Sequence, residues 1–256
     1  MKTAVIVTTF QRPAALARSL PQIVAAAKEV GAPVLVVDDG GQTDLEIERA
    51  IRTITCDVLL TLPENRGLAG ALNIGLSYWL ADPSIEAIHY AQDDVGCDVL
   101  AFSACNEVLA AHPSFLVTAH DAREHHEKPH SLIVDAPGPV VNGIRTRVRP
   151  SCRATHMAMT RQSWIDLMPI PSRGLGLPKR VPRAPNEREQ RGEGSGCDWH
   201  CCRDSAKAKR VLCVPGLLRT FAFTAADSTW SNPQIAGEDD ALHRDAIKEW
   251  VEARAK

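Results

Sequence analysis

Clusters of polar side chains recur in the N-terminal part of this chain, each directly after a short apolar run. The clusters are Thr8, Thr9 and Arg12, then Asp38 and Asp39, then Glu64 to Gly67, and then Gln92, Asp93 and Asp94. In an open parallel sheet, ligands bind beyond the carboxyl ends of the strands. A solvated turn or a helix cap would explain any single cluster. Their succession favours one shared binding site.

The adjacent acids Asp93 and Asp94 are candidates for metal chemistry. Mg²⁺ and Mn²⁺ take one or two carboxylates together with substrate phosphates. A diphosphate bound to such an ion becomes a better leaving group, because the ion neutralises its developing charge. Asp38 and Asp39 follow their strand where an acid can accept hydrogen bonds from a ribose or a base edge.

Two common nucleotide-binding motifs are missing from the sequence. No G-x-G-x-x-G follows the first apolar run, and no G-x-x-x-x-G-K-[ST] occurs anywhere. Their absence weighs against a dinucleotide-dependent oxidoreductase and against a P-loop enzyme.

Strand and helix patterns alternate in the part of the chain that carries these clusters. We expect buried strands at 4–8, 34–37, 58–62 and 87–91, and helices at 13–30, 43–53 and 67–80. Gly31 is a suitable end for the first helix, and Pro21 is a point where it could kink or split. The alternation predicts a parallel α/β sheet with right-handed crossovers.

The second part of the chain has a different pattern. We expect strands at 115–119, 132–134, 140–148 and 153–159, without regular helices between these four, and a further strand at 211–214. Short helices are expected at 161–168 and 197–207, and an amphipathic helix at 238–254. We expect one continuous sheet and one domain over residues 1–256. It divides into a first part (1–96), a second part (97–235) and a C-terminal helix (236–256).

Composition narrows the class of protein. The chain has 256 residues, of which 45% are hydrophobic and 23% charged, with a formal net charge of −2. These values predict a globular protein without a general bias toward nucleic acid. No apolar run is long enough to cross a bilayer, and the first ten residues resemble a buried strand more than a signal peptide. With no export signal, the eight cysteines favour reduced thiols and a cytoplasmic location.

Several motifs together resemble family 2 glycosyltransferases with the GT-A fold. The segments 5–13 and 36–40 are similar to the opening of that family, and 65–75 resembles its N-x-G-x-x-x-A-x-N-x-G helix start. Gln92-Asp93-Asp94 resembles its D-x-D motif, and 194–200 resembles the acceptor-side segment that holds the catalytic base. The match extends from residue 3 to about residue 230, and it rests on the order and spacing of the motifs.

The resemblance implies that 1–96 is the nucleotide-sugar-binding half and 97–235 the acceptor-binding half. It also implies a role for each matching residue. Asp94 would be the metal ligand for Mn²⁺ or Mg²⁺, Asp198 the catalytic base, and Trp199 and His200 acceptor contacts. The nucleotide-sugar donor would be bound by Thr8, Thr9, Arg12, Asp39, Asn65, Arg66, Asn73, Gln92 and Asp93. The chain departs from the family pattern at two positions, because Gln92 replaces the first acid of D-x-D and Thr220 stands where relatives often have a metal-binding His.

The implied mechanism is a single inverting displacement that needs only one base. Asp198 follows Gly-Ser-Gly, so helix N-capping also explains its position. Cys197, His200, Cys201 and Cys202 raise the alternative of a zinc site, although structural zinc normally needs two separated ligand pairs. For Trp164, a place in the core is favoured over a role as a sugar platform.

Two other functions stay open from the sequence. A sugar-phosphate nucleotidyltransferase would usually carry a Gly-rich basic loop after the first strand, where this chain has Thr-Thr-Phe-Gln-Arg-Pro. A catalytically silent nucleotide-sugar-binding module would not need Asp94 and Asp198.

The sequence leaves the acceptor open between a saccharide or glycoside and a hydroxymethylated base in DNA. Residues 172–191 favour an anionic acceptor, because they carry six Lys or Arg against two Glu. A solvated surface loop is the alternative interpretation of this segment.

Overall fold

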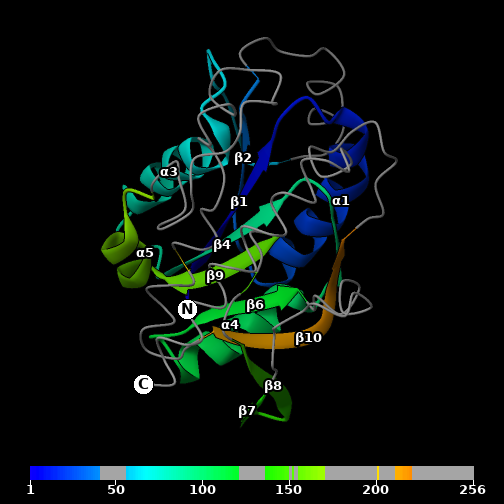
Figure 1. The fold of residues 1–256 in the computed structure, drawn as a ribbon, viewed down its shortest axis with the longest axis vertical. Coiled ribbons are helices and arrows are strands. Elements are labelled where there is room, and N and C mark those ends of the chain that lie inside the picture. Colours follow the sequence, from blue (N-terminus) through cyan, green and yellow to red (C-terminus); the bar gives the residue numbers. More distant parts are fainter. Residues whose placement is uncertain are drawn as a thin grey trace, which may run out of the picture.

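The protein is described by a computed structural model, which defines residues 1–40, 56–120, 136–149, 152, 155–170, 201 and 211–220. Within these residues ten strands form one mixed sheet, in the order β3-β2-β1-β4-β9-β6-β10-β8-β7, with β5 paired to β10. The sheet runs through the whole described part of the molecule (Figure 1). The expectation of a single sheet that serves both halves is therefore confirmed for this part of the chain.

The first part of the sheet is parallel, as predicted. Its strands are β1 (Thr3–Thr9), β2 (Val34–Asp38), β3 (Val58–Thr61) and β4 (Ala87–Gln92). Strand β1 pairs in parallel with β2 on one side and β4 on the other. Every residue of β1 and β2 is buried, as is typical of a sheet that is covered on both faces.

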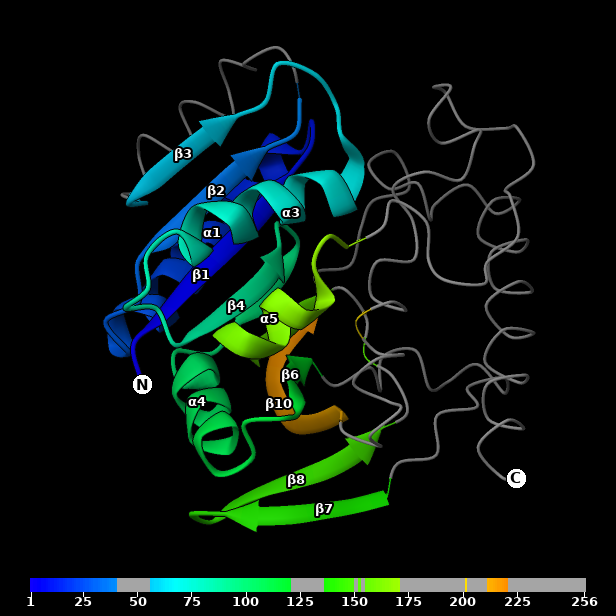
Figure 2. The ribbon, with the colours of Figure 1, turned by 90° about the vertical axis from the view of Figure 1, so that its left-hand side faces the viewer.

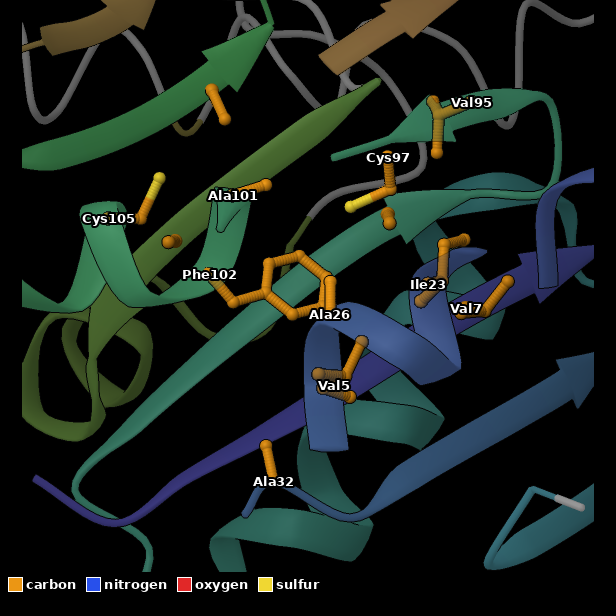
Figure 3. Close-up of a cluster of buried hydrophobic side chains, with 14 of the residues drawn as sticks. Val5, Val7, Ile23, Ala26, Ala32, Val95, Cys97, Ala101, Phe102 and Cys105 are labelled. Carbon is orange, nitrogen blue, oxygen red and sulfur yellow. The ribbon is translucent and has the colours of Figure 1, made fainter. Parts of the chain in front are cut away.

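Helices cover the two faces of this sheet. Helices α3 (Gly67–Leu80) and α5 (Arg161–Leu167) lie on one face, and α1 (Pro13–Glu29) and α4 (Ala101–Ala111) lie on the other (Figure 2). Alternate residues of β1 therefore enter different cores. Val5 and Val7 pack with α1 and α4 (Figure 3), and Ala4 and Ile6 pack with α3 and α5.

Two predicted helices match the structure closely. Helix α1 is continuous through Pro21 and is followed by Gly31 at a φ of 63°. Helix α3 has the expected bounds, and its Gly75 lies against β1, where an added Cβ would come within 2.7 Å of Ile6 Cγ2. The glycine therefore permits close packing of the helix on the sheet. None of the helices in the described ranges has the length and apolar character needed to span a membrane.

The second part of the sheet is mixed. Strand β9 (His156–Thr160) is antiparallel to both β4 and β6 (Leu116–His120). Strand β10 (Val211–Thr220) is parallel to β6 and antiparallel to β5 (Val95–Cys97). It is longer than the predicted 211–214, and it links the outer strands to the turn that follows β4.

One prediction for this part was wrong, and one helix was missed. Residues 140–148 do not form one strand. They belong to a hairpin of β7 (Ala136–Val141) and β8 (Ile144–Arg149). Its turn is formed by Asn142 and Gly143, which have positive φ angles of 47° and 84°. Helix α4, which lies between β5 and β6, was not predicted. Its buried residues have helical spacing.

Several predicted elements lie outside the described residues. They are the helix at 43–53, the strand at 132–134 and the helix at 238–254. The helix at 197–207 also lies outside them apart from Cys201, which is helical.

A chain of buried hydrogen bonds crosses the middle of the sheet. The backbone N–H of Ala119 donates to His156 Nδ1 at 3.0 Å, so His156 must carry its proton on Nε2. That nitrogen lies 3.2 Å from His89 Nδ1, and His89 Nε2 lies 2.9 Å from Asn106 Oδ1. All three hydrogen bonds are therefore donated in the same direction, from β6 through β9 and β4 to α4. This arrangement requires both imidazoles to be neutral.

We predict that mild acid destabilises the fold through this pair. Burial lowers the pKa of His89 to about 4 and that of His156 well below its ordinary value. Between pH 6.5 and 4 the unfolded chain binds protons that the folded chain does not, so stability falls as the pH falls through this window. The His89 shift corresponds to a loss of about 2 kcal/mol at pH 5 relative to pH 7.

The measurement is urea unfolding at pH 5, 6 and 7 for the wild type and for His89→Gln. The variant keeps a hydrogen-bonding side chain and removes the titrating group. It should be less stable at pH 7 and should lose less stability between pH 7 and pH 5. An equal pH dependence in both proteins would contradict the prediction.

Candidate functional site

The predicted polar clusters meet at one edge of the sheet. Strands β1, β2 and β4 are parallel neighbours, and their last residues are Thr9, Asp38 and Gln92. The turn Asp93-Asp94 follows β4 and leads directly into β5. Gln92 is half-buried there, and its backbone N–H donates to the carbonyl of Thr155 at 3.1 Å. The edge therefore carries hydroxyl and carboxylate groups, as the sequence predicted.

Arg12 bridges the two acids. Its Nη1 donates to Asp94 Oδ2 at 3.0 Å, and its Nη2 donates to Asp93 Oδ1. Asp93 has no exposed side-chain surface, whereas Arg12 keeps 23% of its side chain exposed. Arg12 immediately precedes Pro13, the first residue of α1. The cation is therefore held between the buried acids and the surface of the protein.

Further hydrogen bonds fix the turn that carries the acids. Thr9 Oγ1 donates to Asp93 Oδ2 at 2.7 Å, and Ser19 Oγ donates to the backbone carbonyl of Asp93 at 2.6 Å. Ser19 is fully buried in α1, and the sequence analysis did not identify it. Serine is mostly exposed in proteins. A serine on the apolar face of the predicted helix was therefore the sequence signal that could have identified Ser19 as a buried hydrogen-bonding residue.

Burial dominates the electrostatics of the acid pair. Desolvation raises the pKa of Asp93 to about 7, against the opposing effect of Arg12. Burial also raises the pKa of Asp94. Burial lowers the pKa of Arg12, but the two carboxylates outweigh it and the net shift is upward. Arg12 therefore favours the charged form of both acids, and the two acids favour the charged form of Arg12.

The acid pair fits a divalent cation. Asp94 Oδ1 is buried and has no hydrogen-bond partner in the part of the chain that the structure describes. Among those same residues, no group of three or more His, Cys, Asp or Glu could hold a metal ion. One or two carboxylates completed by substrate phosphates is an arrangement that Mg²⁺ and Mn²⁺ accept, whereas zinc normally takes more protein ligands.

The backbone of Thr220 lies beside this turn. In the antiparallel pairing of β10 with β5, Thr220 is the register partner of Val95, the residue after Asp94. The position that the family resemblance associates with a metal-binding His is therefore paired with the residue that follows Asp94.

A second group of predicted donor-binding residues connects β2 with the start of α3. Asp39 Oδ1 accepts a hydrogen bond from the Arg66 backbone N–H at 2.5 Å, and Asn65 Oδ1 accepts one from the Gly67 N–H at 3.0 Å. Gly67 has a φ of 69°, which favours glycine. The Arg66 side chain forms an exposed ion pair with Glu64 at 2.7 Å. This part of the motif shapes the loop between β3 and α3.

Two predicted residues have partners away from the acids. Asn73 exchanges two hydrogen bonds with the backbone of Ile170, from Nδ2 to the carbonyl at 2.7 Å and from the Ile170 N–H to Oδ1 at 2.9 Å. Thr8 Oγ1 lies 2.9 Å from the hydroxyl of Tyr90, a fully buried residue that the sequence analysis did not single out. Asn73 thus ties α3 to the segment after α5.

The remaining candidates divide into two groups. Trp164 is fully buried and donates from Nε1 to the carbonyl of Ile88 at 2.9 Å, which confirms its favoured place in the core. Asp198, Trp199 and His200 lie outside the described residues, as does most of the Cys/His group considered for zinc.

Comparison with solved structures identifies the fold. The mannosyltransferase PcManGT from Pyrobaculum calidifontis, in complex with GDP-Man and Mn²⁺, matches with a TM-score of 0.55 and 18% identity, over 84% of this chain and 55% of that one. GalNAc-T7 with UDP, GalNAc and Mn²⁺ matches with a TM-score of 0.56 and 10% identity, over 87% of this chain and 43% of that one.

The chain has the GT-A fold. S. aureus TarS 1–349 also matches, with a TM-score of 0.50 and 16% identity, over 83% of this chain and 58% of that one. The chain spans roughly half the length of these GT-A structures. No family model and no curated protein matches its sequence.

We predict that Asn73→Ala destabilises this GT-A domain without weakening nucleotide binding. The substitution leaves the N–H and carbonyl of Ile170 without their partners, at a loss of about 1–3 kcal/mol. The measurements are urea unfolding and isothermal titration with a nucleoside diphosphate. Gln162→Ala is the control, because Gln162 is an exposed amide on α5. Unchanged stability with about tenfold weaker nucleotide binding would instead assign Asn73 to the donor site.

Proposed function

We propose that the protein is a metal-assisted glycosyltransferase that transfers a sugar from a nucleoside-diphosphate sugar to a hydroxyl acceptor. The observation that carries the proposal is the buried Asp93-Asp94 turn at the carboxyl edge of a GT-A sheet, with one oxygen of Asp94 left for a ligand. The matched structures of PcManGT and GalNAc-T7 contain nucleotides or nucleotide sugars together with Mn²⁺, which supports the same chemistry here.

The acid turn and its neighbours would bind the donor. Asp94 would hold Mn²⁺ or Mg²⁺, with Asp93 beside it, and the bound ion would neutralise the charge that develops on the leaving diphosphate. Arg12, which binds both acids and keeps 23% of its side chain exposed, would contact the same diphosphate. Thr9 and Ser19 hold the turn in place.

The nucleoside would lie along the ends of β1 and β2. Asp39 accepts a backbone hydrogen bond through Oδ1, and its carboxylate retains acceptor capacity for a ribose hydroxyl or a base N–H. Thr8 is at the adjacent end of β1, and Asn65, Arg66 and Gln92 border the same edge. This placement supports the donor contacts that the family resemblance implied for Thr8, Asp39, Asn65, Arg66 and Gln92.

The proposed reaction is a single inverting displacement. The acceptor oxygen forms a bond to the anomeric carbon while the bond from that carbon to the diphosphate oxygen breaks. The acceptor proton passes to Asp198, and the nucleoside diphosphate leaves with the electron pair of the broken bond. Trp199 and His200, adjacent to the base in the sequence, would contact the acceptor.

The acceptor is proposed to be either a saccharide or glycoside, or a hydroxymethylated base in DNA. The net positive charge of residues 172–191 supports an anionic acceptor. A base in duplex DNA would first have to leave the stack to reach the pocket. Mass spectrometry after incubation with saccharides and with hydroxymethylated duplex DNA separates the two.

The proposal is tested through Asp94. The assay incubates the chain with Mn²⁺ and a panel of UDP- and GDP-sugars and measures the release of nucleoside diphosphate and the mass gain of the acceptors. Asp94→Asn should abolish transfer and remove the Mn²⁺-dependent part of nucleotide binding, because it replaces the charged ligand of the ion. Asp166→Asn is the control, since Asp166 is an exposed acid on α5.

Other outcomes would indicate other functions. Nucleotide binding without any turnover would support a silent binding module, and release of pyrophosphate from a nucleoside triphosphate and a sugar phosphate would support a nucleotidyltransferase. Mn²⁺-dependent nucleotide affinity that is equal in the wild type and in Asp94→Asn would refute the assignment of Asp94.

For the proposed base, we predict that Asp198→Asn keeps donor binding and loses transfer. The base acts only in the chemical step, so kcat should fall by about 10²–10⁴-fold while the affinity for the nucleotide stays close to that of the wild type. Steady-state kinetics and nucleotide titration on the same preparation check this. If transfer stays within a few-fold of the wild type, the base is another residue and Asp198 is a helix cap.

A further inference from the structure

We infer that Arg12 is an internal cation that neutralises the acid pair until a donor diphosphate arrives, so that the metal ion binds tightly only together with the donor. The inference rests on the proposed function and concerns the order of binding at the same site. It assigns Arg12 a second property besides contact with the donor, namely control of metal affinity.

The first argument is the position of the guanidinium. Arg12 contacts both acids at once, through Nη1 to Asp94 and through Nη2 to Asp93. The side chains of Asp93 and Asp94 are only 0% and 6% exposed. Two adjacent buried carboxylates repel each other and are poorly solvated, so a cation between them is needed for both to be charged. In the described structure, Arg12 performs this part of the role of a metal ion.

The second argument concerns what is left for an ion. Of the four carboxylate oxygens in the pair, only Asp94 Oδ1 has no hydrogen-bond partner in the described part of the chain. A divalent ion at this oxygen would meet the positive charge of Arg12, which is bound to the other oxygen of the same carboxylate. The net charge of the two acids and Arg12 is only −1, compared with −2 for the acids alone. Arg12 therefore weakens the attraction for an ion that arrives without a counter-anion.

The third argument is that the donor can change this balance. Arg12 keeps 23% of its side chain exposed and immediately precedes α1, at the edge of the sheet where the diphosphate is proposed to bind. A diphosphate is a ligand both for guanidinium and for Mn²⁺ or Mg²⁺. Once it is bound, its negative charge offsets the repulsion between the two cations, and the ion gains phosphate ligands in addition to Asp94. Metal and donor then raise each other's affinity.

The test measures Mn²⁺ binding to the full chain by electron paramagnetic resonance of the free ion, with and without GDP or UDP. The Mn²⁺ bound by the nucleotide itself is measured separately and subtracted. Arg12→Gln removes the internal cation and keeps a hydrogen-bonding side chain. Arg18→Gln is the matched control, because it removes the same charge from an exposed position on α1.

In the wild type, nucleotide should tighten Mn²⁺ binding by about tenfold or more. Without nucleotide, Mn²⁺ should bind to Arg12→Gln about tenfold more tightly than to the wild type. The increase in Mn²⁺ affinity on adding nucleotide should be smaller in the variant than in the wild type. Arg18→Gln should behave as the wild type. Circular dichroism checks that Arg12→Gln is folded, and if it is not, the wild-type comparison decides alone.

Two results would overturn the inference. One is Mn²⁺ binding by folded Arg12→Gln that is no tighter than that of the wild type, and the other is wild-type Mn²⁺ affinity that does not respond to nucleotide. An active transferase with either result refutes the inference and leaves the proposed function intact. The expected metal response without transfer to any acceptor would count against the proposed function instead.

Discussion

The burial of Asp93 is the constraint around which this region is organised. A fully buried carboxylate is unfavourable unless it is paired and hydrogen-bonded. Here the compensation comes from the end of β1 (Thr9) and the loop after it (Arg12), and Ser19 of helix α1 binds the backbone carbonyl of the same residue, Asp93. The β1–α1 unit is thereby attached to the turn between β4 and β5. The same contacts that stabilise the fold fix the direction of the acid pair.

The start of α3 shows a similar overlap of architecture and chemistry. Gly67 supplies a positive φ, Gly75 permits contact with Ile6, and Asn73 binds the backbone of Ile170. The motif at 65–75 is therefore explained largely by packing and backbone geometry. Its link to function is indirect, because the helix begins where the Arg66 N–H binds Asp39 and so holds that acid at the edge of the sheet.

The parallel half of the fold could be predicted from the sequence, because its strands are short apolar runs and helix α1 has helical spacing and is followed by Gly31. Strand β3 was expected to be buried, but as an edge strand it is only partly buried. The meeting of the clusters at one edge followed from the parallel topology alone. Strand pairing in the second half could not be predicted in this way. Strand β10 pairs with three strands distant in sequence, and no local pattern encodes such partners.

Other details were missed for local reasons. The Asn142-Gly143 turn was present in the sequence, but the apolar residues on either side suggested one strand. The contact of Arg12 with both acids depends on the path of the chain between β1 and α1, where Gln11 has a φ of 50°. Sequence spacing indicates that Arg12 is near the site, but not that it spans the acid pair. The pairing of charges could therefore be recognised only in three dimensions.

The route of β10 explains why this site would depend on its donor for metal binding. By pairing with β5, β10 brings Thr220 next to the residue that follows Asp94, at the position where the family resemblance expects an imidazole ligand. A threonine hydroxyl is a much weaker ligand for Mn²⁺ than an imidazole. In the proposed site, Asp94 would then be the principal protein ligand, while Arg12 offsets part of its charge. Under the proposal, both features would reduce the affinity of the protein alone for the ion, and the phosphate oxygens of the nucleotide sugar would compensate for both.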